Sequence, residues 1–375
     1  MSYPSGRHFL QIPGPTNVPE QVLRAMAKPT IDHRGPEFKA LALEVLGGLK
    51  PVFKTAGPVV IFASSGTGAW EAGLVNTLSP GDKVLMFETG HFATLWKNMA
   101  VRLGLEVDFV PGDWRHGADP AVVEAKLAED RDHRIKSVMV VHNETSTGVT
   151  SRIAGIRKAI DRTGHPALFM VDTISSLGSI DYRHDEWGVD VTVGCSQKGL
   201  MLPPGLGFNA ISAKALAAAK TAKLPKSYWG WEEMLTTNQG GFFPSSPATN
   251  LLYGLREALR LLREEGLDNV FARHIRHGEA TRRAVRTWGL EILCLDPEEY
   301  SPVLTTVVMP GWKGADAYRA GLLYGLAAGL DWPLTGRLAS LLGALKIAKR
   351  GGQNHHFTRD EIAQRFKQEF GTRIW

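Results

Sequence analysis

Short apolar runs rich in valine, isoleucine and phenylalanine alternate with amphipathic stretches of helical length along the first half of the chain. Apolar runs of this length indicate buried strands, and apolar residues three and four positions apart indicate helices that cover a sheet. Their alternation is typical of βαβ units, so we predict an α/β fold with a large, doubly wound, mostly parallel sheet. The predicted strands are residues 59–63, 83–87, 137–141, 167–171 and 191–194, and the clearest helices between them are residues 68–78 and 119–127.

The pattern changes after Ser246, where a long helix is predicted over residues 248–265, followed by a charged helical stretch to about Trp288 and strand-like residues 303–309. Prolines and glycines among residues 2–19 favour an extended arm. A chain of 375 residues also exceeds the usual size of one domain. We therefore expect an N-terminal arm of residues 1–20, a large domain of residues 21–258, and a smaller, atypical C-terminal α/β region of residues 259–375.

Composition narrows the function mainly by exclusion. The chain is 43% hydrophobic and 22% charged, as ordinary globular proteins are, and its charge of +5 is scattered. Neither a nucleic-acid-binding stripe nor a polybasic membrane tract is present, which leaves small anionic molecules as partners. Cys195 and Cys294 lack metal-ligand spacing, so we expect no metal site and a reducing compartment. With no apolar run of about 18 residues and no signal-like N-terminus, we predict a cytoplasmic protein.

A glycine-rich turn follows the first predicted strand, at residues 64–69 (SSGTGA). In parallel sheets, ligands bind beyond the carboxyl ends of the strands. Glycines let the backbone approach an anion, and the free amides of a helix's first turn point toward a phosphate. A turn of this kind also serves as a purely structural cap, so by itself it leaves both interpretations open.

Asp172 and Lys198 follow two later predicted strands. A carboxylate at a strand end can hold the protonated ring nitrogen of a pyridine cofactor, or it can cap the next turn. A lysine before a stiff Pro/Gly loop can be desolvated for imine formation, or it can be a solvated loop charge. The ordered set of anion turn, acid and lysine favours the functional interpretation of each.

Six ordered segments stand out along the chain: IPGPTNVP, SSGTGAWEA, HNETSTGV, VDTISSLG, GCSQKGLMLPPGLGF and SPATNLLYGLREAL. Together they resemble the class V aminotransferases, specifically the branch that contains the serine-glyoxylate and alanine-glyoxylate enzymes, from about residue 8 to about residue 312. The resemblance implies the type I fold of the transferases that depend on pyridoxal 5'-phosphate, and that compound as the cofactor.

The resemblance also implies a role for each matching residue. Lys198 forms the Schiff base with the cofactor and afterwards carries the substrate's Cα proton, and Asp172 pairs with the pyridine nitrogen. The remaining cofactor-binding positions are Thr67, Gly68 and Gln197 at the phosphate, Phe92 on the ring face, Thr145 near the phenolic oxygen, and Ala69 and Ile174 nearby.

In the same family the neighbouring subunit touches the cofactor phosphate through an aromatic residue and a threonine that precede the PATN motif. Phe243 and Ser246 stand at these places, where Ser246 keeps a hydroxyl and Phe243 cannot donate a hydrogen bond. The resemblance therefore implies a homodimer with its site at the subunit interface.

The activity implied is transfer of an amino group from an amino acid to glyoxylate with ping-pong kinetics, which yields a keto acid and glycine. Serine is our first choice of donor, and aspartate and alanine remain alternatives. Tyr228, Trp229 and Trp231 either line the substrate channel or pack at an interface.

The C-terminal part departs from the family, because no segment supplies the small-domain arginine that grips the substrate carboxylate. Residues 314–375 instead resemble the closing segment of ribokinase-type sugar kinases, although the turn at residues 314–317 lacks one glycine and the kinase body is absent. Asp316 is therefore not assigned a phosphotransfer role. A chimeric chain that binds cofactor but is catalytically impaired is the alternative function, and Arg337 and Arg350 are the nearest candidate replacements. A desulfurase is disfavoured because Cys195 lies only three residues before Lys198.

Overall fold

The computed structural model describes residues 12–308, 315–347 and 357–374. The chain divides into two compact units. The larger unit comprises Pro13–Trp288 and Ile292–Thr306, and the other comprises Met1–Ile12, Gly289–Glu291 and Val307–Trp375. All of the predicted cofactor-binding residues belong to the larger unit, so its architecture determines the candidate site.

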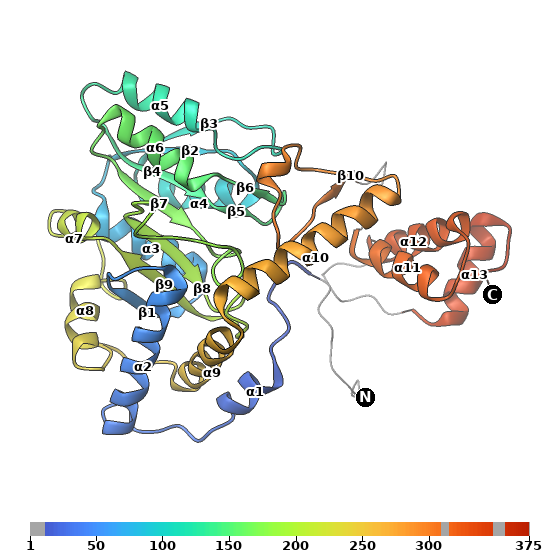
Figure 1. Ribbon diagram of the computed structural model, residues 1–375, viewed down its shortest axis with the longest axis horizontal. Coiled ribbons are helices and arrows are strands. Elements are labelled where there is room, and N and C mark those ends of the chain that lie inside the picture. Colours follow the sequence, from blue (N-terminus) through green and yellow to red (C-terminus); the bar gives the residue numbers. More distant parts are fainter. Residues whose placement is uncertain (1–11, 309–314, 348–356, 375) are drawn as a thin grey trace. The chain divides into compact units, whose positions relative to one another are not determined.

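A seven-stranded sheet forms the centre of the larger unit, in the order β1-β9-β8-β7-β4-β2-β3 (Figure 1). Only β9 runs antiparallel to its neighbours β1 and β8, and the other pairs are parallel. The predicted α/β fold with a mostly parallel sheet is thus confirmed. The strands are β1 (Val59–Ser64), β2 (Lys83–Phe87), β3 (Glu106–Val110), β4 (Ile135–Val141), β7 (Leu168–Asp172), β8 (Val191–Cys195) and β9 (Gly205–Ile211).

Helices cover both faces of this sheet, because the side chains of each strand alternate between the two faces. Val60 and Phe62 of β1 share a buried cluster with helices α3, α4, α7 and α8. Val59 and Ile61 pack with α1, α2 and α9, and a third cluster joins β2, β4 and β7 to α5 and α6. The helices are α1 (Glu20–Met26), α2 (Pro36–Phe53), α3 (Gly66–Thr77), α4 (His91–Arg102), α5 (Pro120–Glu129), α6 (Ile153–Thr163), α7 (Ala213–Ala219), α8 (Trp231–Gln239), α9 (Thr249–Glu265) and α10 (Leu267–Thr287).

Two strands of the central sheet were not predicted. The apolar run of β3 is short and is interrupted by acidic residues, and β9 begins inside the segment that we interpreted as a Pro/Gly loop. β9 is nevertheless buried along nearly its whole length, because it lies between β1 and β8. The five predicted strands were placed to within two residues of their observed ends.

The shorter elements complete the fold. β5 (Asn143–Glu144) pairs with β6 (Val149–Thr150), and β10 (Glu291–Ile292) pairs with β11 (Val307–Val308). The predicted strand at residues 303–309 is therefore strand only at β11 within the described residues. A short 3₁₀ helix spans Pro297–Glu299.

Helices are the only regular elements among the described residues after 314. They are α11 (Ala315–Ala327), α12 (Trp332–Ile347) and α13 (Arg359–Phe370). α13 begins with a capping box, in which the Thr358 hydroxyl accepts from the Glu361 amide and the Glu361 carboxylate accepts from the Thr358 amide. Leu338, Leu342 and Phe366 contribute to a buried cluster of this segment, which therefore has a small core of its own.

Candidate active site

Asp172 is the last residue of β7 and lies opposite Val193 of β8. Its side chain is buried, with 3% of the residue exposed. One carboxylate oxygen, Oδ1, accepts from the Ile174 amide at 2.6 Å, and the other, Oδ2, accepts from Trp70 Nε1 at 2.9 Å. Burial raises the pKa of Asp172 to about 7, although both hydrogen bonds oppose that rise. The strand end therefore presents an acid that is poised near neutrality.

Lys198 lies three residues beyond the end of β8, in the loop that leads to β9. Its Nζ donates to the Pro13 carbonyl oxygen at 2.9 Å. The arm is held to this loop at a second point, where the Thr16 amide donates to the Gln197 carbonyl at 3.0 Å. Burial lowers the pKa of Lys198, while the charge of Asp172 raises it. The two predicted catalytic groups are thus close enough for each to perturb the pKa of the other.

The predicted anion turn connects β1 with α3 and lies beside the Asp172 loop. A Cβ built at Gly66 would collide with the Ile174 side chain and would lie 3.5 Å from the Cβ of Cys195. A side chain at position 66 would therefore require the Ile174 side chain to move. Ser65, the N-cap of α3, makes no side-chain capping hydrogen bond, and Thr67 is exposed in the first turn. The start of α3 is therefore available to an anion, next to Ile174 and the end of β8.

Two other predicted cofactor-binding residues, Gln197 and Ala69, are partly and fully buried. Ala69 is fully buried in the core between α3 and the sheet. Gln197 Oε1 is buried and has no hydrogen-bond partner among the described residues. A buried amide oxygen without a partner fits a site that a hydrogen-bond donor completes.

Glu144, which was not predicted as a site residue, connects the predicted residues Phe92 and Thr145. Phe92 is in the first turn of α4, and its amide donates to Glu144 Oε1 at 3.3 Å, while the Ala93 amide donates to Oε2 at 3.1 Å. Glu144 is buried and directly precedes Thr145. It therefore caps α4 and fixes the position of Phe92. The sequence offered one signal for Glu144, because its carboxylate comes shortly after the predicted strand at residues 137–141.

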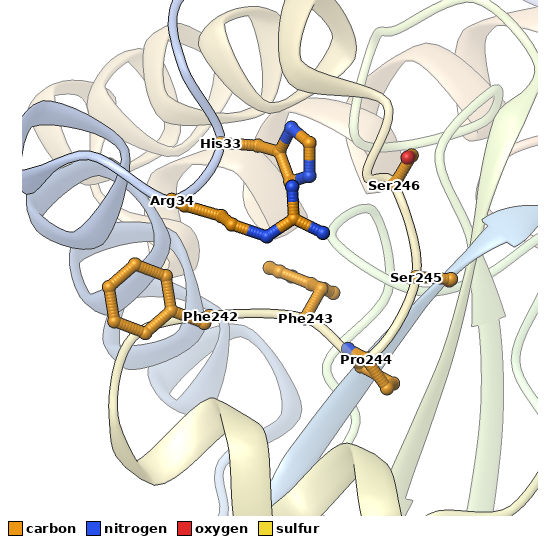
Figure 2. A pocket seen from close by; sticks show the side chains of 7 residues that line it. All are labelled: His33, Arg34, Phe242, Phe243, Pro244, Ser245 and Ser246. Carbon is orange, nitrogen blue, oxygen red and sulfur yellow. The ribbon is translucent and has the colours of Figure 1, made fainter.

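Phe243 and Ser246 come together in a different place, a cavity of about 520 Å³. His33 and Arg34 line the same cavity, and Figure 2 shows the Arg34 guanidinium pointing into the space above Phe243. Arg34 supplies the permanent positive charge of the lining, and no acidic side chain lines it. The loop that carries the predicted phosphate-contacting residues thus borders an electropositive hollow.

The aromatic residues at the start of α8 and just before it lie in different environments. Trp231 is buried in the core, where its Nε1 donates to Asn209 Oδ1 at 3.2 Å. Trp229 packs edge-on against Phe62 at 5.2 Å and lies against Gly68, so it borders the anion turn. Tyr228 is exposed, and its hydroxyl donates to the Ala63 carbonyl at 3.3 Å.

Arg337 projects from α12 over the ring of Phe370, with its guanidinium carbon 5.8 Å from the ring centroid. The other candidate carboxylate ligand, Arg350, lies outside the described residues. Both cysteines are free and buried, and burial raises the pKa of Cys195 to about 12, so its thiol is unreactive near neutrality.

The described residues hold neither a metal-binding cluster nor a helix that could span a membrane. No group of three or more His, Cys, Asp or Glu side chains there is arranged to hold a metal ion. Within the same residues, every helix is too short or too polar to cross a membrane.

Comparison with known proteins identifies the family. The sequence profile of "Aminotransferase class-V" matches residues 8–320. The chain belongs to the class-V aminotransferases. It is 48% identical to a serine–glyoxylate aminotransferase of Methylorubrum extorquens over 334 residues, which cover 86% of this chain and 83% of the relative. It is 46% identical to an L-aspartate–glyoxylate aminotransferase of Paracoccus denitrificans over 307 residues, which cover 82% and 77%.

A solved structure agrees with this assignment. The alanine–glyoxylate aminotransferase of Nostoc sp. superposes with a TM-score of 0.78 at 32% identity, covering 86% of this chain and 85% of the other. Membership of the class-V aminotransferases confirms the predicted enzyme class and pyridoxal phosphate as cofactor. The residues present fit that cofactor, since the uncapped start of α3 can receive a phosphate, a buried acid ends β7, and a lysine of lowered pKa follows the neighbouring strand β8.

Proposed function

We propose that this aminotransferase moves the amino group of an amino acid, serine in the first place, to glyoxylate, and releases glycine and a keto acid. The observation that carries the proposal is the 48% identity, over 86% of the chain, to an enzyme named for serine and glyoxylate. Aspartate is the second donor to consider, because a relative named for aspartate and glyoxylate is 46% identical.

Lys198 and Asp172 are the proposed catalytic residues. Bound pyridoxal phosphate supplies an electron sink for the charge left when the substrate's Cα loses its proton. Lys198 would hold the cofactor covalently, and its freed amine would accept the substrate's Cα proton and deliver it to C4′ of the cofactor. A lowered pKa keeps more of this amine unprotonated. Asp172 holds the proton of the ring nitrogen in place through a charged hydrogen bond.

The remaining predicted residues bind the cofactor. The first-turn amides of α3 at Thr67 and Gly68, with Gln197, hold the phosphate, and Phe92 lies on the ring. Thr145 reaches the phenolic oxygen, and Ala69 and Ile174 pack beside the site. Their support is the uncapped start of α3 and the anchoring of Phe92 by Glu144.

We further propose a homodimer in which Phe243 and Ser246 of each subunit reach the other subunit's phosphate. The cavity that these residues share with Arg34 is positively charged, as a phosphate-facing surface must be. The three-part domain division, cytoplasmic localisation and common origin of residues 314–375 with a kinase tail remain predictions. For the last of these, the family match ends at residue 320, close to residue 314, where the kinase-like segment begins.

The test uses full-length protein supplied with pyridoxal phosphate and glyoxylate. Serine, aspartate and alanine are added one at a time, and glycine is measured by mass spectrometry. We expect glycine with serine and its loss in Lys198→Ala, which removes the amine that carries the proton. Equal rates in wild type and Lys198→Ala would disprove the assigned lysine. Cofactor binding without glycine from any donor would favour the impaired chimera.

A further inference from the structure

Two stacked tryptophans lie behind the strand ends of the candidate site. Trp70 is on α3 and Trp96 on α4, with ring centroids 5.8 Å apart and ring planes 14° from parallel. Both are buried, with 3% and 1% of the residue exposed. Their size, burial and packing are nearly equal, so each alone would be interpreted as a core residue.

Their indole nitrogens differ. Trp70 Nε1 donates to Asp172 Oδ2 at 2.9 Å. Trp96 Nε1 is also buried, but it has no hydrogen-bond partner among the described residues. A buried donor without a partner is unfavourable, and a buried carboxylate requires donors to remain charged. The stacked pair thus contains one indole that acts on the acid and one that does not.

The hydrogen bond constrains Asp172 in two ways. The Ile174 amide holds Oδ1 and Trp70 holds Oδ2, so the plane of the carboxylate is fixed by donors from two different segments. Trp70 also lies two residues after Gly68, on the helix whose start forms the anion turn. One rigid helix therefore sets both the anion-binding amides and the orientation of the acid.

We propose that Trp70 is a positioning residue, whose indole N–H keeps Asp172 ionised and oriented toward the cofactor's ring nitrogen. This inference rests on the proposed function, because it assigns Asp172 to that nitrogen. It assigns no contact between Trp70 and substrate or cofactor. Trp70 acts only through the carboxylate that it holds.

The pair provides a matched control. Trp70→Phe and Trp96→Phe each shorten a buried stacked indole by the same atoms, and hence the packing losses are comparable. Only Trp70→Phe removes a donor from Asp172. Any effect that follows from packing alone must appear in both variants.

The first measurement uses the protein without cofactor. Asp172 has a pKa of about 7 in the folded chain, so its contribution to stability is lost as pH rises toward that value. Trp70→Phe removes a hydrogen bond to the charged carboxylate and should therefore raise the pKa of Asp172 by about one unit. The pH at which the stabilising contribution of Asp172 has disappeared should rise by the same amount. Urea unfolding at half-unit pH intervals measures this dependence of the unfolding free energy on pH. Trp96→Phe should show the same pH dependence as wild type.

The second measurement uses the protein loaded with pyridoxal phosphate. Trp70→Phe should weaken cofactor affinity by about tenfold and shift the pH titration of the cofactor's visible absorbance, and Trp96→Phe should do neither. Wild type without a lysine-bound absorbance band would refute the proposed function itself. Wild type with the band, but with equal behaviour of the two variants, would refute only the role of Trp70.

A second variant covers failure of Trp70→Phe to fold. Replacement of Trp70 by benzothienylalanine keeps the two-ring shape and exchanges the N–H for sulfur, so packing is retained while the donor is lost. The same shifts are expected from it. Unchanged pH profiles and cofactor affinity in this variant would overturn the proposal.

Discussion

Lys198 Nζ lies 2.9 Å from the carbonyl oxygen of Pro13, so the proposed catalytic amine is bound by the N-terminal arm. Thr16 extends this contact, because its amide and hydroxyl donate to the carbonyls of Gln197 and Lys198 at 3.0 and 3.2 Å. The arm and the lysine loop are 185 residues apart in sequence. Their contact makes the arm part of the site that holds the lysine in place.

Gly14 tests this contact. Its φ is +145°, which disfavours a side chain, and a Cβ there would collide with Lys198 Nζ. We predict that Gly14→Ala displaces the amine and slows formation of the cofactor's lysine-bound absorbance by about tenfold or more. Stopped-flow absorbance after addition of pyridoxal phosphate measures the rate.

Gly104→Ala is the control, because Gly104 also has a positive φ, +79°, but a Cβ there meets no atom within 4 Å. Each variant should lose about 1–3 kcal/mol of unfolding free energy from backbone strain. Only Gly14→Ala should slow cofactor attachment. Equal attachment rates in the two variants would show that the arm does not hold Lys198 for this step.

The lowered pKa of Lys198 predicts unusual reactivity in the cofactor-free protein. Burial disfavours the ammonium, so the neutral, nucleophilic amine forms at a lower pH in the folded chain than in the unfolded chain. Competitive labelling with trace acetic anhydride, followed by peptide mass spectrometry, should give Lys198 a lower midpoint in folded protein than in urea. Asp172→Asn should lower the folded midpoint further, because the charge of Asp172 stabilises the ammonium. Identical midpoints in folded and unfolded chains would contradict the prediction.

The raised pKa of Asp172 predicts that the folded protein loses stability as pH rises. The pKa of Asp172 is raised from 3.8 to about 7, so the folded chain binds more protons than the unfolded chain between these values. Its contribution is therefore fully present below about pH 4 and is lost as pH rises through 7. Between pH 5 and pH 8 the cofactor-free wild type should lose about 3 kcal/mol more unfolding free energy than Asp172→Asn, as measured by urea titration. Parallel pH profiles for the two proteins would rule out the raised pKa.

Local patterns sufficed to predict most of the large unit. The strands that end at Val141 and Asp172 lie next to each other because runs of buried β-branched residues alternate with helices. β9 was missed because Gly205 and Gly207, which suggest a loop, lie in a buried antiparallel strand between two neighbours. Its pairing depends on residues that are distant in sequence.

The candidate site could be proposed from the sequence only for residues that carry a family motif. Asp172 and Lys198 follow strands, and this position made them candidates. Trp70 and Glu144 were not assigned roles, because their partners Asp172 and Phe92 lie 102 and 52 residues away. Hydrogen bonds between distant segments leave no periodicity in a sequence, so only coordinates reveal them.

A shared dimer site would make each subunit depend on the other's loop. If Ser246 of one subunit faces the other subunit's phosphate, Ser246→Asp places a negative charge against that phosphate and prevents cofactor binding in the other subunit. Ser246 is exposed in its own chain, so the change should leave the fold intact. Lys198→Ala is inactive for a different reason, the loss of the amine.

Mixing these two inactive variants tests the arrangement. After joint refolding, half of the dimers are mixed, and each mixed dimer has one site with an intact Lys198 and a partner loop with an intact Ser246. Glycine formation should return to about a quarter of the wild-type rate. A mixture of Lys198→Ala with the double variant Lys198→Ala, Ser246→Asp contains no intact lysine and should stay inactive. If native mass spectrometry detects mixed dimers and the first mixture is also inactive, Ser246 does not act across the interface.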